Sequence, residues 1–338
     1  MRISIVIPVY NNTRDLPECL SAVKASAKNL DAEIIVVDDA STDETPSVAA
    51  SMGVHVLKLP KNSGPGAARN FGAHQASGDI LFFVDADVVL APGSLDRAMM
   101  LLDTRPEFCA VFGSYDSRPR ARGVVSQYRN LLHHFVHQQG NPEASTFWAG
   151  CGAIRRDVFL AVGGFDAKRF PRPSIEDIEL GVRLRRLGHR ILLDREIQAT
   201  HLKRWSLASV IRTDITCRAI PWTRLILESR EAPDDLNLKL GQRVSAALVA
   251  LATALVPLAL WRVDLLVLPL ASLLLVVVLN RALFTFLRRQ RGLGFALACV
   301  PLHLLYFLYS GLSYLFVRLE MQLKGMRARR TPRAGEAR

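Results

Sequence analysis

The sequence predicts an α/β domain followed by a group of hydrophobic helices. In the first part of the chain, short apolar runs alternate with segments whose apolar residues recur every three or four positions. Strands that are apolar almost throughout are typical of a parallel sheet covered by helices on both faces. From Val244 to Val317 the sequence contains only six formally charged residues. Long uncharged stretches of this kind are typical of helices that span a membrane.

Four strands and their helices account for about the first hundred residues. The expected strands are Ile3–Ile7, Glu33–Val37, His55–Leu59 and Ile80–Val84. The expected helices are Leu16–Ala27, Thr45–Met52, one that follows the glycine-rich stretch from Lys61, and one opened by Pro92. Pro8 is expected to end the first strand, because proline cannot donate a ladder hydrogen bond.

The pattern is looser after about Leu102. The segments expected there are a strand at Ala110–Ser114, a helix up to His137, a helix at Ser174–Leu187 and a strand at Gln198–Thr200. The next segment, Leu207–Ile226, is amphipathic and is expected to be interrupted at Pro221. It suits either a surface helix of the domain or a helix lying on the membrane with Trp222 in the interface, and periodicity alone does not separate these two interpretations.

Three segments are candidates for membrane spans: Val244–Trp261, Leu265–Leu279 and Leu293–Val317. The basic loop Arg288–Arg291 is expected on the cytoplasmic side, together with the N-terminal domain. Three crossings would then place the basic tail on the opposite side, against the positive-inside tendency. The number of complete crossings therefore stays open at this point.

The charge distribution favours a membrane surface over nucleic acid as the partner. The net charge is +12, and the tail from Arg318 alone holds seven Lys and Arg against two Asp and Glu. A nucleic-acid binder would concentrate basic residues on its folded domain. The five cysteines form no CxxC pair, which indicates a reducing compartment, and the start of the chain has no signal-peptide pattern.

Acidic residues follow two of the expected strands. In a parallel α/β sheet, ligands bind at the carboxyl ends of the strands, so these residues are candidates for one shared site. Asp85 and Asp87 are two positions apart and would point the same way in an extended chain, which suits Mg²⁺ or Mn²⁺; a solvated turn is the alternative. Asp38 and Asp39 suit hydrogen bonds to a nucleobase or ribose, although part of this motif could cap the next helix through Thr42 or Asp43.

Further candidates lie outside these strand ends. Glu176 and Asp177 could only stabilise a helix start capped by Ser174, or Asp177 could also act as a general base. Arg69 follows the glycine-rich turn and could reach a phosphate. His201 lies beside Lys203 and Arg204, a basic cluster that could meet a diphosphate. A metal site at His133 and His137 is a weaker possibility, because the zincin pattern requires Glu where this chain has His134.

Six ordered motifs resemble the family 2 glycosyltransferases, over roughly residues 1–204. They read IVIPVYNN, IIVVDDASTD, NSGPGAARNFGA, GDILFFVDADV, VGGFD and EDIELGVRLRRLGHRI. The resemblance implies a GT-A fold, which is a Rossmann-like mixed sheet, here followed by C-terminal transmembrane helices. It also implies a nucleotide-sugar donor.

The resemblance assigns roles to individual residues. Asp85 and Asp87 match the motif that binds Mg²⁺ or Mn²⁺ with the donor diphosphate, and His201 corresponds loosely to a metal-contacting position. The residues implied to lie near the nucleotide-sugar are Pro8, Tyr10, Asp38, Asp39, Arg69 and Asp85. Asp177, with Glu176 before it, matches the catalytic base of inverting members.

The implied function is metal-dependent, inverting transfer of a hexose-type sugar to a lipid or cell-envelope glycan acceptor. The QxxRW motif of processive synthases is absent from the comparable region at Ile215–Ala219, which favours transfer of single sugars. A polyprenyl-phosphate glycosyltransferase and a catalytically inactive membrane scaffold are the alternatives. The oligomeric state stays unknown.

The expected organisation is a cytoplasmic catalytic domain joined to a multi-pass anchor in the inner membrane. The expected boundaries are residues 1–228 for the catalytic domain with a possible interface helix at 205–226, 229–243 for a linker, 244–317 for the membrane domain, and 318–338 for a basic tail.

Overall fold

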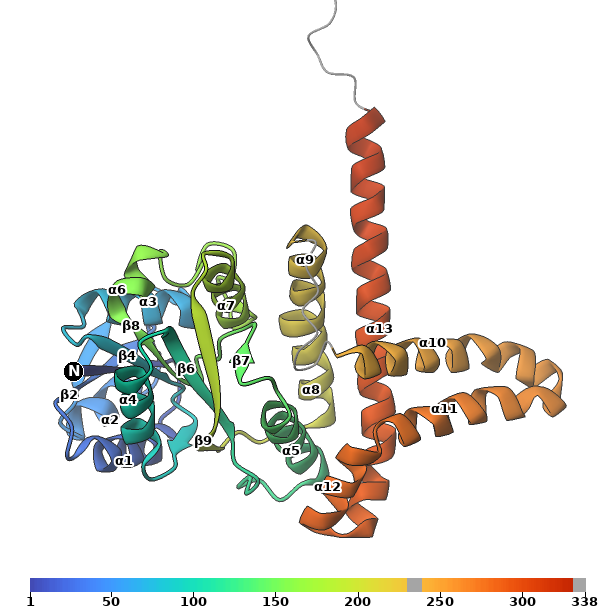
Figure 1. Cartoon of the computed structure of the whole chain (residues 1–338), viewed down its shortest axis with the longest axis horizontal. Coiled ribbons are helices and arrows are strands. Elements are labelled where there is room, and N and C mark those ends of the chain that lie inside the picture. Colours follow the sequence, from blue (N-terminus) through green and yellow to red (C-terminus); the bar gives the residue numbers. More distant parts are fainter. Residues whose placement is uncertain (230–238, 331–338) are drawn as a thin grey trace, which may run out of the picture. The chain divides into compact units, whose positions relative to one another are not determined.

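The computed structural model describes residues 1–229 and 239–330, with only the backbone of residues 229 and 325–330 (Figure 1). These residues form two compact units, and each is described by itself. The first consists essentially of Met1–Ser206 and the second of most of the chain from Leu207 onward.

The first unit is built on a nine-stranded mixed sheet. Its strands are β1 (Ile3–Val9), β2 (Ala32–Asp38), β3 (His55–Lys58), β4 (Ile80–Val84), β5 (Val88–Leu90), β6 (Phe108–Tyr115), β7 (Glu143–Ala144), β8 (Cys151–Arg155) and β9 (Arg190–His201). Their order is β3-β2-β1-β4-β8-β6-β9-β5, and β7 pairs with β9. The parallel pairing expected from the apolar runs is confirmed for β1 to β4. The strands β5, β7 and β8, which were not among the expected strands, pair antiparallel, so the sheet is mixed as the family resemblance implied.

Helices cover both faces of this sheet (Figure 1). They are α1 (Leu16–Ala27), α2 (Thr45–Ser51), α3 (Pro65–Gln75), α4 (Ser94–Thr104), α5 (Val124–Gln138), α6 (Arg156–Ala161) and α7 (Glu176–Arg186). Alternate residues of β1 enter different cores, because successive strand side chains point to opposite faces. Ile5 and Ile7 pack with α1 and α4, whereas Val6 packs on the face covered by α3 and α7.

Pro8 does not end the first strand, which continues to Val9. Pairing of β1 with β4 stops at Val6, whereas pairing with β2 continues through Pro8 and Val9. Because β4 has no residue opposite Pro8, the missing N–H breaks no ladder bond on that side.

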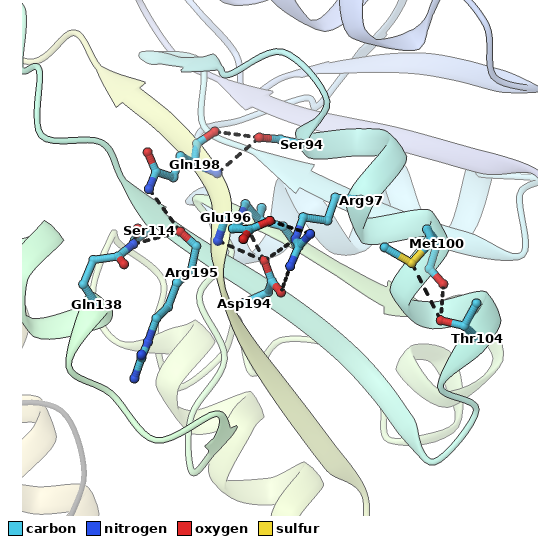
Figure 2. Close-up of polar contacts among 11 residues, drawn as sticks. Ser94, Arg97, Met100, Thr104, Ser114, Gln138, Asp194, Arg195, Glu196 and Gln198 are labelled. Atoms are coloured by element: carbon cyan, nitrogen blue, oxygen red, sulfur yellow. Dashed lines mark hydrogen bonds and ion pairs between the residues drawn. The ribbon is translucent and has the colours of Figure 1, made fainter.

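A bulge in β9 is held by polar contacts from α4 and α5 (Figure 2). Arg97 forms two bonds to Asp194, of 2.6 and 2.8 Å, and Asp194 Oδ1 also accepts from the backbone nitrogens of Glu196 and Ile197. Gln138 donates to Ser114 Oγ at 3.0 Å and to the Arg195 carbonyl at 2.9 Å. Because this bulge is fixed, the last residues of β9 are directed toward the carboxyl end of β4.

The second unit is entirely helical within its described residues. Its elements are α8 (Leu207–Thr213), a π-helical turn (Asp214–Ala219), α9 (Ile220–Ser229), α10 (Leu240–Trp261), a 3₁₀ turn (Val263–Leu266), α11 (Val267–Leu279), α12 (Arg281–Arg291) and α13 (Leu293–Arg330).

Two helices of this unit are long and apolar enough to cross a membrane. They are Leu240–Trp261 and the stretch Leu293–Lys324 of α13. A third span, as expected from the sequence, would require Val263–Leu279 and Arg281–Arg291 to cross together, although they are bent by 66° at the break between them. Asn280 lies at this break and donates to Ser245 Oγ of α10 at 2.9 Å, so the break is fixed by a buried polar contact.

The expected interruption at Pro221 is wrong. The helical path from Leu207 to Ser229 is continuous, and the π-helical turn precedes Pro221. Such a turn accommodates proline because it changes the hydrogen-bond spacing where the proline N–H is missing. This segment packs along α13: Tyr309 donates to Asp214 at 2.6 Å, and Arg224 pairs with Glu320 at 2.8 Å.

Parts of the expected linker and tail lie outside the described residues. These are residues 230–238 of the linker and 331–338 of the tail. Within the described chain, α10 begins at Leu240, and α13 continues past Val317 to Arg330.

Candidate functional site

The loops after β1 and β2 are joined to each other. The backbone nitrogen of Asn11 donates to Ser41 Oγ at 2.9 Å, and that of Thr42 donates to Asn11 Oδ1 at 2.8 Å. Asn11 and Ala40 both have left-handed backbones, with φ of 48° and 61°. Strained conformations of non-glycine residues cluster at ligand sites. Pro8 is buried at the base of these loops and Tyr10 is exposed above it, so Tyr10 is accessible to a ligand.

Asp39 ties the end of β2 to the glycine-rich loop before α3. Its two carboxylate oxygens accept from the backbone nitrogens of Ser63 and Gly64, at 2.7 and 2.8 Å. Burial and the charge of Asp38 raise the pKa of Asp39, although the two hydrogen bonds oppose this increase. The expected N-cap at Thr42 or Asp43 is wrong, because the N-cap of α2 is Glu44, although Asp43 Oδ1 accepts from the backbone nitrogen of Thr45 at 3.0 Å. Asp38 and Asp39 thus lie at the predicted place, and contact with a nucleotide stays a prediction.

The two carboxylates of the Asp85–Asp87 motif meet different partners. These residues form a turn between β4 and β5, in which the nitrogen of Val88 donates to the Asp85 carbonyl at 3.0 Å. The expectation that both side chains point the same way from an extended chain is therefore wrong. Asp85 faces Arg69, whereas Asp87 faces His201.

Arg69 bridges this turn to the start of α7. Its Nη2 lies 2.5 Å from Asp85 Oδ1, and its Nη1 lies 3.1 Å from Glu176 Oε1. The guanidinium is buried, so a bond to phosphate would require it to leave one of these carboxylates. Burial raises the pKa of Asp85, and the positive charge of Arg69 opposes that increase.

Asp177 follows Glu176 and is the candidate base. Its Oδ2 accepts from the backbone nitrogen of Ala149 at 3.2 Å. Burial and the neighbouring charge of Glu176 raise the pKa of Asp177 to about 7, although Arg69 and two backbone N–H groups oppose the increase. A carboxylate with a pKa near neutrality is suited to take a proton from a hydroxyl.

Ser174 is not the cap of this helix. The residue before α7 is Ile175, and no side chain caps the helix. Instead, the Ser174 nitrogen donates to Glu176 Oε2 at 2.9 Å. The Glu176 carboxylate is thus held by Ser174 on one oxygen and by Arg69 on the other.

His201 reaches Asp87 through the pairing of β5 with β9. His201 lies opposite Val88 in this ladder, and the nitrogen of Leu202 donates to the Asp87 carbonyl at 2.9 Å. His201 Nε2 and Asp87 Oδ2 are 3.4 Å apart. Burial opposes ionisation of Asp87, but its contact with His201 and the charge of Lys203 outweigh burial, so the pKa of Asp87 is lowered.

The pair of Asp87 and His201 fits a divalent cation. Two neighbouring ligands about 2.1 Å from an octahedral ion are about 3 Å apart, close to the spacing between these two atoms. Within residues 1–229 and 239–330, no group of three or more His, Cys, Asp or Glu side chains is arranged to hold a metal. Mg²⁺ sites of one or two protein ligands completed by phosphate oxygens and water fit this arrangement, and Asp85 is engaged by Arg69 instead.

Several residues of the site were not anticipated from the sequence. Asn12 donates from Nδ2 to the Ala86 carbonyl at 3.3 Å, and its place in the first motif was the available signal. Asn130 of α5 lies 2.9 Å from His201 Nδ1, and no local pattern marks it.

His133 and His137 stack with a centroid distance of 4.0 Å beside Trp148, so their four-residue spacing reflects packing in an aromatic cluster.

The fold and these strand-end residues define a GT-A-type domain. Residues 4–163 match the family model described as Glycosyl transferase family 2. This matched region is just under half of the chain and lies within the α/β unit, so the α/β unit is similar to the family 2 glycosyltransferases.

Two relatives illustrate the sequence similarity. An uncharacterized glycosyltransferase, YwdF, of Bacillus subtilis is 32% identical over 172 residues, which cover 49% of this chain and 63% of the relative. A dolichol-phosphate mannosyltransferase of Pyrococcus furiosus is 27% identical over 210 residues, covering 60% of this chain and 54% of the relative. The chain thus matches less than two thirds of the length of either relative.

One solved structure resembles the chain over most of its length. It is the mannosyltransferase PcManGT from Pyrobaculum calidifontis in complex with GDP-Man and Mn²⁺, with a TM-score of 0.57 and 19% identity. The match covers 93% of this chain and 87% of that one. At this identity the likeness shows the fold alone.

Proposed function

We propose that this chain is an inverting glycosyltransferase that moves one sugar at a time from a nucleotide-sugar to a lipid or cell-envelope glycan acceptor. The position of Asp177 carries this proposal. A half-buried carboxylate with a pKa raised to about 7 lies beside Glu176, and Arg69 links Glu176 to the Asp85–Asp87 turn. A base and a candidate diphosphate site are thus connected through one ion-paired side chain.

The proposed reaction is a single displacement. Asp177 accepts the proton of an acceptor hydroxyl while that oxygen attacks the anomeric carbon and the bond to the nucleoside diphosphate breaks, which inverts the configuration. Bound at Asp87 and His201, Mg²⁺ or Mn²⁺ supplies positive charge that offsets the charge of the leaving diphosphate. Pro8, Tyr10, Asp38 and Asp39 would line the nucleotide site.

The apolar helices support action at a membrane. Two helices are long enough to cross one, and the α/β unit would lie on the cytoplasmic face of the inner membrane. Ile215–Ala219, where a processive synthase would carry its motif, lies in the π-helical turn and has neither the Gln nor the Trp in register. This supports transfer of single sugars.

A pocket lined in part by Leu202, the residue after His201, favours a second candidate function, which is transfer to a phosphate-bearing acceptor. The pocket has a volume of about 270 Å³, and its lining includes Arg14, Arg120, Leu202 and Arg204. Arg14 pairs with Asp15, and Arg120 with Glu18, but Arg204 forms no ion pair within the described part of the chain. Since guanidinium groups bind phosphate in a bidentate manner, a polyprenyl phosphate suits this pocket.

The test is nucleotide release from a panel of uridine and guanosine diphosphate sugars with Mg²⁺ or Mn²⁺, with and without membrane lipid extract. The proposal expects release that depends on the acceptor and that is lost in both Asp87→Asn and Asp177→Asn. If both variants keep full activity, the site assignment is wrong. If a donor binds but no acceptor supports release, the chain is an inactive scaffold.

Two acceptors distinguish the two enzyme functions. A polyprenyl phosphate and the polyprenol of the same length differ only in the phosphate. Activity on the phosphate alone, which survives Asp177→Asn but falls in Arg204→Ala, would favour the second candidate, because a phosphate oxygen needs little base catalysis. Arg105→Ala is the control, since Arg105 is an exposed arginine that pairs with Glu107.

A further inference from the structure

His201 is held on its second ring nitrogen by a residue of α5. Asn130 Oδ1 lies 2.9 Å from His201 Nδ1, and both side chains are buried. An amide oxygen can only accept a hydrogen bond, so with the amide oriented in this way the ring proton is on Nδ1. In the neutral ring the lone pair is then on Nε2, the atom that lies 3.4 Å from Asp87 Oδ2.

The plane of the His201 imidazole ring is fixed as well. Tyr115 of β6 stacks on His201, with ring centroids 4.4 Å apart and an interplanar angle of 8°. A ring held by a hydrogen bond in its plane and by stacking across its face keeps one orientation, so Nε2 is directed at Asp87 before any ligand arrives.

The amide of Asn130 is unfavourable for the stability of the fold. Its Nδ2 is buried and has no hydrogen-bond partner among the described residues. An unsatisfied buried amide of this kind lowers stability, and an apolar side chain of similar size would avoid that loss. The amide is therefore better explained by its effect on His201 than by packing.

We propose that Asn130 is a positioning residue that directs the Nε2 lone pair of His201 toward a divalent cation shared with Asp87. This inference rests on the metal-binding part of the proposed function. Partners of the second nitrogen of a ligating histidine set the tautomer and the ring orientation, and losing such a partner typically weakens metal binding about 10- to 100-fold.

The alternative is an amide turned the other way. Asn130 Nδ2 would then donate to His201 Nδ1, and Nε2–H would donate to Asp87 as a structural hydrogen bond with no place for a cation. Asn130→Asp distinguishes the two arrangements, because a carboxylate accepts from Nδ1–H but cannot donate to a lone pair.

The experiment measures Mn²⁺ binding to the purified full-length chain in detergent, by electron paramagnetic resonance of free Mn²⁺, alone and with UDP or GDP. Asn130→Leu is expected to raise the Mn²⁺ dissociation constant about tenfold or more. Asn130→Asp should bind Mn²⁺ at least as well as the wild type. Pulsed resonance should detect ¹⁴N coupling from a directly coordinated imidazole in the wild type and in Asn130→Asp, and not in Asn130→Leu.

Gln138→Leu is the matched control. Gln138 is another amide of α5 that bonds the sheet region, to Ser114 and Arg195, at the end of the helix away from Asn130 (Figure 2). This variant should lose thermal stability without a change in Mn²⁺ affinity. A purely structural role for Asn130 would make Asn130→Leu behave like Gln138→Leu.

Three results overturn the proposal: wild-type Mn²⁺ affinity in Asn130→Leu, loss of Mn²⁺ binding in Asn130→Asp, or no Mn²⁺ binding by the wild type with or without nucleotide. Failure of the proposed function is separable, because it shows as Mn²⁺ binding that depends on Asn130 without sugar transfer to any acceptor.

Discussion

Arg69→Met removes the cation that bridges Asp85 and Glu176, and the cost in stability can be worked from the structure. The side chains of Arg69 and Glu176 are 5% and 7% exposed, and that of Asp85 is 34% exposed. Breaking a buried ion pair by removing one partner costs about 3–5 kcal/mol, because the remaining charge is left without a partner. In a unit of this size, where 1 kcal/mol corresponds to about 2–4 °C, the unfolding midpoint should fall by about 6–20 °C.

Arg97→Met is the matched control. Arg97 likewise pairs with two carboxylates, those of Asp194 and Glu196, but its side chain is 32% exposed and theirs are 12% and 71% exposed (Figure 2). A partly solvated pair is worth about 1 kcal/mol, so the expected decrease is about 2–4 °C. Both midpoints can be read from thermal unfolding of the purified chain in detergent.

The pH dependence of the Arg69→Met effect has a definite sign. Arg69 lowers the pKa of both Asp85 and Asp177, so its removal raises both values. A group whose pKa is raised by folding contributes stability at low pH and loses that contribution as the pH rises through the folded-state pKa. The deficit of Arg69→Met should therefore be larger at about pH 8 than at about pH 6. Equal losses in Arg69→Met and Arg97→Met, or a deficit that shrinks toward pH 8, would refute the reasoning.

Three further predictions concern the base, a close packing contact and the helical unit. Sugar transfer by the wild type should rise with pH and level off above about pH 7, because Asp177 must be ionised to accept a proton, and Asp177→Asn should lower the rate about 10²–10⁴-fold in initial-rate assays. Gly72→Ala should destabilise the α/β unit by about 1–3 kcal/mol, since the new Cβ would lie 2.6 and 2.9 Å from two valine side-chain carbons. Gly123→Ala, with no atom within 4 Å, should change the unfolding midpoint little. Tyr309→Phe removes the O–H that donates to Asp214 at 2.6 Å and should cost the helical unit about 1.5–3 kcal/mol in thermal unfolding, and an unchanged midpoint would show that this bond is not stabilising.

Local patterns were sufficient to predict the first half of the α/β unit. The predicted helix Leu16–Ala27 and the predicted strand Ile80–Val84 have the bounds that the structure gives to α1 and β4. Both follow from periodicity of apolar residues, a property of short segments that needs no knowledge of distant partners. The family motifs likewise located the acidic residues at the strand ends, since the motifs that contain them cover a strand and the loop directly after it.

The sequence did not reveal which side chain each of these acidic residues contacts. Asp85 and Asp87 belong to one motif, but the turn between them sends one carboxylate to Arg69 and the other to His201. The antiparallel pairing of β5 with β9 joins residues more than 100 positions apart, and Arg97 bonds to the bulge that precedes the paired residues of β9.

The sequence by itself thus determined the fold class, the family resemblance, the hydrophobic helices and the candidate residues. Only the tertiary structure decided that Arg69 connects the Asp85–Asp87 turn to the start of α7 and that Asn130 holds His201. The physical reason is the separation in sequence between the residues that interact. Helix and strand periods are set by neighbouring residues, whereas the partner of a buried charge or amide is chosen by long-range packing, which no local pattern records.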